Sequence, residues 1–381
     1  MHRIGLVLVF TGIITVSAYS QKSSNNREKF RPVKFLDESP VKDQYRSNTC
    51  WDYSTIGMLE SELLRQGKGS YDLSEMFIVW HTYAEKAIKY IRLHGNMSFT
   101  GGGFSNDVID VIRKYGIVPN SVYDGLRAGK TLPDHVEMDK VLKSYLDGVL
   151  ENQTLRLSDI WFSGFCKILD SYLGKIPAKF KYEGQVYTPK SFADSLGIVP
   201  DDYIMITSFT HHPFYSKFII EVPDNWNWGE AYNLPLKEMM SVINNSLDSN
   251  YTVVWDADNS ERGFSFTKGI AALPDLDPSA SESDWNKALS NLGAEVTVTQ
   301  SLRQEQFDKF LTTDDHGMQI TGMADDDSGK LFYYVKNSWG TSNPYQGHLY
   351  ASEAYMELKT ISIMVNKHAL TPEMRDKLGI Q

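Results

Sequence analysis

The sequence predicts an α+β protein in which helices come first along the chain and strands come last. Apolar residues repeat with helical spacing between residues 51 and 115. After residue 252, short runs of β-branched and aromatic residues dominate instead. Candidate reactive side chains occur in both parts, so we expect two lobes with a site in the cleft between them.

Composition and charge limit the possible functions. The chain has 381 residues, of which 41% are hydrophobic, and this is enough for a large core. Its formal net charge is −10. Nucleic-acid binding requires a basic surface, so we expect no nucleic-acid partner.

The first residues have the layout of a secretory signal peptide. Arg3 precedes an apolar stretch over residues 4–16, and small residues follow from Ala18 to Ser20. This stretch is too short to span a bilayer, so membrane contact should be transient, during export to the periplasm or the medium. An uncleaved anchor is the alternative. Residues 21–34 are expected to form a polar leader, and residues 35–381 the folded domain.

Three amphipathic helices are predicted in the first third of the chain. The first covers residues 51–64 and should stop at Gly67. Ser74 is placed to cap the second. Ser105 is placed to cap the third, which Gly116 should end. Their aromatic and methionine stripes indicate core packing and no cofactor, and none is expected.

Five strands are predicted in the last third, over residues 252–255, 319–323, 331–335, 347–351 and 361–365. Residues 325–329 (Asp-Asp-Asp-Ser-Gly) lie between two of them. A calcium loop would need a later glycine and a glutamate at a set offset, so a hairpin turn is predicted. Thr371 and Pro372 should start a final helix, which Gly379 stops.

Cys50 is the candidate nucleophile. It opens the first predicted helix, where free backbone N–H groups and the helix dipole should favour a thiolate. Gln44 lies six residues earlier, and its amide could hold a developing oxyanion together with the N–H of Cys50. Trp51 follows Cys50 directly. The only other cysteine, Cys166, lies in an apolar stretch, where a buried unpaired thiol is expected.

The partners of Cys50 are expected in the strand-rich part. His316, at the start of a strand, could accept the thiol proton and return it to a leaving amine. Asn337, at a strand end, could fix the tautomer and orientation of His316, and Trp339 could cover their hydrogen bond. Each residue alone is a weak signal, but the ordered set predicts acyl transfer by a cysteine.

At these residues the sequence resembles the papain superfamily of cysteine peptidases. Gln44, Cys50, His316 and Asn337 match that family's oxyanion donor, nucleophile, base and orienting amide. The segment from Asn337 to Gly340 is the most specific match. The resemblance also implies that the backbone of Gly102 and Gly103 binds extended substrate.

Spacing narrows the resemblance to the bleomycin hydrolase or aminopeptidase C branch. His316 and Asn337 follow Cys50 by 266 (316 − 50) and 287 (337 − 50) residues, more than papains show. An insertion over about residues 126–243 would account for this. The branch implies peptide substrates, removal of N-terminal residues, a possible homohexamer and a C-terminal arm in the cleft. The arm looks short here, which leaves endopeptidase action in an open cleft as an alternative.

Further alternatives remain on the same scaffold. A thiol acyltransferase or an amidase of cell-wall peptides would use the same chemistry, and a binding protein would use none. His211 and His212 have no third ligand at recognisable spacing, so no metal site is expected.

Overall fold

The computed structural model describes residues 29–380, except for residues 128, 152–155 and 278. The predicted signal peptide therefore lies outside the described residues, as does the leader up to residue 28. No helix in this described part is long and apolar enough to cross a membrane.

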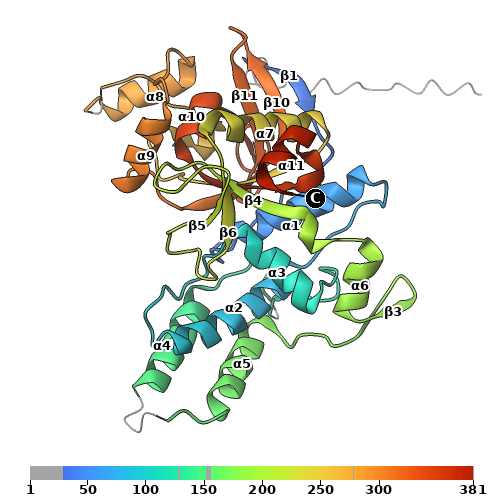
Figure 1. Cartoon of the computed structure of the whole chain (residues 1–381). Helices are drawn as coiled ribbons and strands as arrows, with labels where there is room; N and C mark the ends of the chain where they lie inside the picture. Colours follow the sequence, from blue (N-terminus) through green and yellow to red (C-terminus); the bar gives the residue numbers. More distant parts are fainter. Residues whose placement is uncertain (1–28, 128, 152–155, 278, 381) are drawn as a thin grey trace, which may run out of the picture.

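One lobe is mainly helical and lies below the sheet in Figure 1. Helices α2, α3, α4 and α5 gather there, a short hairpin and α6 flank them, and α1 runs along the junction with the other lobe. These elements are α1 (Cys50–Arg65), α2 (Glu75–Arg92), α3 (Ser105–Tyr115), α4 (Val136–Leu150), α5 (Ile160–Leu173), β2 (Phe180–Tyr182), β3 (Gln185–Tyr187) and α6 (Pro189–Leu196).

The other lobe is built on one large sheet, which has eleven strands within the described residues. Its order is β5-β6-β4-β13-β7-β10-β11-β12-β9-β8, with β1 also paired to β10. The β4–β6 and β9–β12 pairs are parallel, and the other pairs are antiparallel. The strands are β1 (Phe30–Phe35), β4 (Tyr203–Thr207), β5 (Lys217–Ile219), β6 (Glu230–Asn233), β7 (Val253–Ala257), β8 (Phe264–Ser265), β9 (Ile270–Ala271), β10 (His316–Asp326), β11 (Leu331–Lys336), β12 (His348–Ser352) and β13 (Thr360–Asn366).

The middle of the sheet is buried on both faces, and the period-two geometry of strands divides its side chains between two cores. In β7, Val254 joins the core of the helical lobe, whereas Val253 and Trp255 join the core on the opposite face. Helices cover or flank that opposite face (Figure 1), namely α7 (Leu236–Asp248), α8 (Glu282–Asn291), α9 (Gln300–Asp308), α10 (Glu353–Lys359) and α11 (Pro372–Leu378). The sheet is thus a shared wall between two hydrophobic cores.

The predicted helices are confirmed, with one correction at a helix start. Ser74 caps α2, because its side chain accepts a hydrogen bond from the N–H of Phe77. Ser105 does not cap α3. The helix already begins at Ser105, and Phe104 occupies the cap position, with its N–H donated to the Asp107 carboxylate over 3.0 Å. Ser105 instead turns its hydroxyl toward the sheet.

All five predicted strands are confirmed as β7, β10, β11, β12 and β13, and α11 is the predicted final helix. The acidic turn joins β10 to β11, where Gly329 has φ +82° and its N–H donates to the carbonyl of Asp326. The leader needs a correction, because residues 30–35 form β1. Phe30 is 5% exposed and packs on Tyr350, so Phe30 belongs to the folded part.

The segment predicted as an insertion, residues 126–243, does not form a separate unit. Its helices α4 and α5 pack on α2, and its strands β4 and β6 extend the main sheet beyond β13. That this segment is an insertion stays a prediction.

Candidate active site

Two glycines allow α1 to lie directly against β10. A Cβ atom at Gly317 would come within 2.9 Å of the Ser54 hydroxyl and 3.1 Å of the Trp51 backbone. A Cβ at Gly57, one turn further along α1, would meet the Gln319 side chain at 2.6 Å. The first turn of the helix and the first residues of the strand are therefore in contact, and this brings Cys50 next to His316 and Gly317.

Cys50 is the first residue of α1 and is half-buried in the cleft. No side chain caps this helix start, although Thr49 holds the cap position and its carbonyl accepts from Asp52 and Tyr53. The N–H of Cys50 thus remains available to a substrate oxygen.

The predicted ease of thiolate formation is not supported by the surroundings of Cys50. Burial raises the pKa of Cys50 to about 12, the backbone of Gly317 lowers it, and the charges of Asp314, Asp256 and Asp224 raise it further. Loss of solvation is the largest of these effects and favours the neutral thiol.

The ring of His316 is held in one tautomer. Its Nε2 lies 2.8 Å from Oδ1 of Asn337. The N–H of Ser338 donates to the same Oδ1 over 2.6 Å, which identifies that atom as the amide oxygen. Nε2 of His316 must therefore carry the proton, and Nδ1 is left as a free acceptor.

Trp339 covers this pair as predicted, with its ring centroid 4.6 Å from that of His316. His316 is 4% exposed and Asn337 is 2% exposed. Burial lowers the pKa of His316 to about 4, although the hydrogen bond to Asn337 acts in the opposite direction. The imidazole is thus neutral at neutral pH and ready to accept a proton.

Gln44 is fixed against the segment that carries Asn337. Its side-chain oxygen accepts a 2.6 Å hydrogen bond from the Ser338 hydroxyl, and its backbone N–H donates to the Ser338 carbonyl over 2.8 Å. This leaves the amide nitrogen of Gln44 for the cleft, which Gln44 lines together with Cys50. The loop between them contains two left-handed residues, Tyr45 (φ +46°) and Asn48 (φ +55°), at positions that favour glycine.

The glycine loop before α3 forms another wall. The Trp51 indole donates to the carbonyl of Gly101 over 3.0 Å, which ties this loop to α1. The Gly102 N–H donates to the Thr100 hydroxyl, and its carbonyl accepts from Lys86. No hydrogen bond joins the Gly103 backbone to another described residue. Of the two predicted glycines, Gly103 thus has its backbone available for substrate.

The cleft has a volume of about 620 Å³ and draws its walls from both lobes. Its lining residues are Gln44, Tyr45, Asn48, Cys50, Trp51, Thr100, Gly102, Gly103, Asp224, Asp256, Asn259, Asp314, Asp315, His316, Gly317 and Trp339. All eight residues predicted for the site are placed around it, because Asn337 lies directly behind His316.

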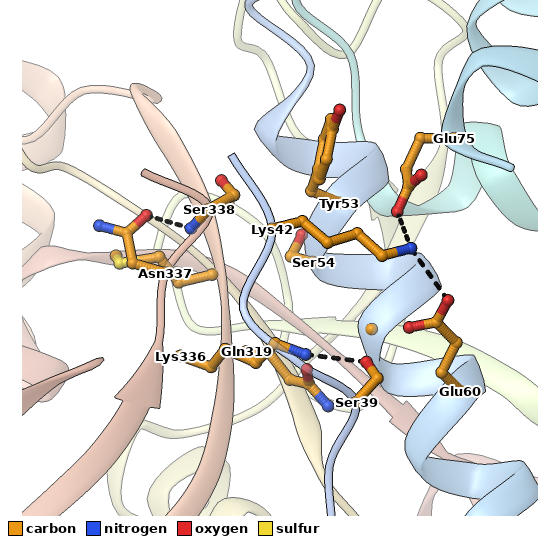
Figure 2. A pocket seen from close by; sticks show the side chains of 13 residues that line it. Ser39, Lys42, Tyr53, Ser54, Glu60, Glu75, Gln319, Lys336, Asn337 and Ser338 are labelled. Atoms are coloured by element: carbon orange, nitrogen blue, oxygen red, sulfur yellow. Dashed lines mark hydrogen bonds and ion pairs between the residues drawn. The ribbon is translucent and has the colours of Figure 1, made fainter. Parts of the chain in front are cut away.

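A buried polar layer lies behind this site (Figure 2). Lys42 reaches Glu60 and Glu75 at 3.1 and 2.6 Å, and Lys336 donates to the Ser39 hydroxyl over 2.9 Å. The carboxylates of Glu75 and Glu60 raise the pKa of Lys42 well above its usual value, although burial opposes this. The layer lines a small pocket of about 20 Å³, large enough for one water molecule.

The fold does supply a third polar group to His211 and His212. Glu221 contacts both Nε2 atoms, at 3.1 and 2.9 Å. The Gln304 amide uses its oxygen for the N–H of Thr210 and donates its N–H to Nδ1 of His211, so Nε2 of His211 carries a proton. This tautomer opposes metal binding at Nε2.

Sequence reasoning missed several residues of the cleft, and three of them matter most for its geometry and charge. Gly317 stands beside His316, but its role as a contact point for α1 depends on packing. Asp314 precedes His316 by two residues, and only the structure shows that it faces the cleft. Asp224 comes from a distant loop and has no local signal.

Cys166 is unpaired as predicted, but it is half-buried and not fully buried.

Comparisons with known proteins agree on one family. A family model described as Peptidase C1-like matches residues 176–380. Aminopeptidase C of Streptococcus thermophilus is 23% identical and covers 89% of this chain and 82% of its own. Aminopeptidase C of Listeria monocytogenes is 22% identical, covering 96% and 90%. The crystal structure of PepW from Lactobacillus rhamnosis has the same fold, with a TM-score of 0.69 at 20% identity over 91% of this chain and 84% of its own.

Proposed function

Because the chain belongs to the Peptidase C1-like family, we propose that it is a thiol aminopeptidase whose catalytic residues are Cys50, His316 and Asn337. The main support is the fixed tautomer of His316, whose Nδ1 is free in the cleft that also contains Cys50. The relatives named aminopeptidase C cover at least 89% of this chain and support removal of N-terminal residues from peptides.

Catalysis begins with a neutral thiol and a neutral imidazole. Sγ of Cys50 attacks the carbonyl carbon of the first peptide bond as its proton moves to Nδ1 of His316. The carbonyl oxygen becomes negative and is held by the N–H of Cys50 and the amide nitrogen of Gln44. His316 then gives the proton to the departing amine, and the acyl group remains on Cys50 as a thioester.

Water completes the cycle. His316 takes a proton from the attacking water, and the thioester breaks as Sγ of Cys50 is protonated again. Asn337 keeps the ring oriented through both proton transfers, and Trp339 keeps water away from the bond between them.

The test compares the two cysteines of the chain. Cys50→Ala should lower kcat/KM on an unblocked peptide by at least about 1000-fold, since no other group replaces the nucleophile. Cys166→Ala is the matched control and should retain wild-type turnover, because Cys166 lies on α5, outside the cleft. Turnover by Cys50→Ala equal to that of the wild type would rule out the proposed nucleophile.

Export and assembly extend this proposal. Export through a cleaved leader at residues 1–20 and a homohexamer both stay predictions from the sequence. N-terminal sequencing of the mature protein tests the first, and its mass in solution tests the second.

A further inference from the structure

The cleft beside Cys50 carries negative charge with no cationic side chain in its lining. Apart from Cys50, His316 and Tyr45, its ionisable residues are all acids, namely Asp224, Asp256, Asp314 and Asp315. None of the described lining residues is Lys or Arg.

Two of these acids already have hydrogen-bond donors. Asp256 is 3% exposed and accepts from the hydroxyls of Ser362, at 2.8 Å, and Ser105, at 3.3 Å. Asp315 accepts from the Thr313 hydroxyl over 2.9 Å. Hydrogen bonds from within the protein therefore satisfy the carboxylates of both Asp256 and Asp315.

Asp314 and Asp224 have no such donors among the described residues. Oδ2 of Asp314 is shielded from solvent and accepts no hydrogen bond. The Asp224 carboxylate lies over the glycine loop, where a Cβ at Gly102 would come within 2.1 Å of it. Lys86 is a buried cation near Asp224, but its ammonium is bonded to the carbonyls of Thr100 and Gly102.

Two partly buried carboxyls without donors are costly when ionised. Burial raises the pKa of Asp314 well above its ordinary value, and the charge of Asp224 adds to this. Burial also raises the pKa of Asp224, which Lys86 opposes. A primary ammonium would supply up to three donors and a compensating charge.

The position of the pair suits the end of a peptide. Asp314 lies two residues before His316, Asp224 lies against the glycine loop, and the two carboxyls are close enough for the charge of Asp224 to act on Asp314. In a peptide, a single Cα atom separates the N-terminal ammonium from the first carbonyl carbon. An ammonium held between these acids therefore leaves the first peptide bond near Cys50.

We propose that Asp314 and Asp224 together bind a primary ammonium group of the substrate and thereby select substrates by positive charge. This inference rests on the proposed function and assigns specificity within the same cleft. The N-terminal amine is the expected source of the ammonium, and a lysine side chain is the other.

The experiment uses Asp314→Asn and Asp224→Asn, which keep side-chain shape and remove charge. Asp327→Asn is the matched control, since it removes the same charge from the exposed hairpin turn. Each protein is given a lysine-free peptide with a free N-terminus, the N-acetylated copy of that peptide, and an acetylated peptide with lysine beside the cleaved bond. Thermal unfolding of each variant checks that its fold is retained.

We expect both cleft variants to lose at least tenfold in kcat/KM on the free-amine peptide, mainly through KM, with the acetylated copy unaffected. A loss confined to the lysine peptide would support the ammonium site with a side chain as its source. Unchanged kinetics, or a loss through kcat alone, would overturn the inference. Failure of the proposed function is distinct, because the wild type would then cleave none of the peptides or Cys50→Ala would cleave them equally well.

Discussion

Ser338 determines which ring nitrogen of His316 carries the proton, although Ser338 does not contact the ring. Its backbone N–H and the Nε2–H of His316 share Oδ1 of Asn337, so the ring has one acceptor left. The Ser338 hydroxyl also holds the oxygen of Gln44. One residue thus orients the groups proposed as orienting amide and oxyanion donor, which explains why a small hydroxyl side chain suits this position.

The acid side of the pH profile follows from the buried imidazole. His316 has a pKa of about 4, lowered by burial, so it is a neutral base above that pH and protonated below it. We expect kcat at saturating peptide, where bound substrate keeps Asp314 and Asp224 ionised, to be steady near neutral pH and to fall as the pH drops through about 4. Cys50, with a pKa of about 12, stays a thiol throughout this range.

Steady-state kinetics between pH 3 and 8 measure this, with near-UV circular dichroism as the check on folding. An acid limb centred near 6.5, the usual histidine pKa, would contradict the buried and neutral state of His316.

At this scale the sequence indicated which residues form the site but not their electrostatics. Cys50, His316 and Asn337 stand in recognisable local motifs, so their juxtaposition could be predicted. The pKa of Cys50 could not, because it depends on burial and on Asp224, Asp256 and Asp314. Asp224 reaches the cleft from a loop 174 residues (224 − 50) after Cys50, and no local pattern marks it.

The contact between α1 and β10 is the element-level basis of the site. Gly57 and Gly317 remove side chains where the helix crosses the strand, so the backbones approach closely. The start of α1, which carries the thiol of Cys50, therefore lies against the start of β10, which carries the imidazole of His316.

Gly317→Ala should separate these two elements. The added methyl would meet the Ser54 hydroxyl at 2.9 Å and the Trp51 backbone at 3.1 Å, so α1 or β10 has to shift. The required shift is a few tenths of an ångström, and a 1 Å misplacement costs about 100-fold, so we expect kcat/KM to fall by about tenfold.

Gly148→Ala is the control, because a Cβ at Gly148 in α4 has no neighbour within 4 Å. It should keep full activity. Kinetics together with thermal unfolding of both variants make the comparison, and an unimpaired Gly317→Ala enzyme would refute the close-contact account.

Helix starts and strands were predicted correctly where the local sequence determines them. The predictions failed where contacts with distant parts of the chain determine them. Ser74 caps α2 as its residue type suggests. Ser105 has the same preference, but its hydroxyl donates to Asp256 of the sheet, and the helix starts one residue earlier than a serine cap requires. The strand at residues 30–35 was missed because its pairing partner is almost the whole chain away.

At the scale of the whole molecule, the large sheet joins the first described residues to a strand from the last third of the chain. Strand β1 lies antiparallel to β10, with Phe30 opposite Asp326. Phe30 packs on Phe332 and Tyr350 in a small core of its own. The first described residues are thus part of the β-rich lobe that carries His316.

The variant Phe30→Ala tests whether β1 folds together with the β-rich lobe. Phe30 is 5% exposed, so removal of its ring should lower the free energy of unfolding by roughly 3 kcal/mol. Val33→Ala, on the same strand but 55% exposed, should change it by less than about 0.5 kcal/mol. Denaturant unfolding measures both, and equal small effects would place β1 outside the cooperative fold.

The pairing of β1 with β10 has a consequence for biosynthesis. Phe30 and Asp326 are 296 residues apart (326 − 30), and a ribosome adds about 5–20 residues per second. The first strand therefore waits on the order of 15–60 s for its partner. Cys50 waits in the same way for His316, so a nascent chain carries a thiol without its base. Peptidase activity should appear only when synthesis is nearly complete, and truncated translation products should be inert.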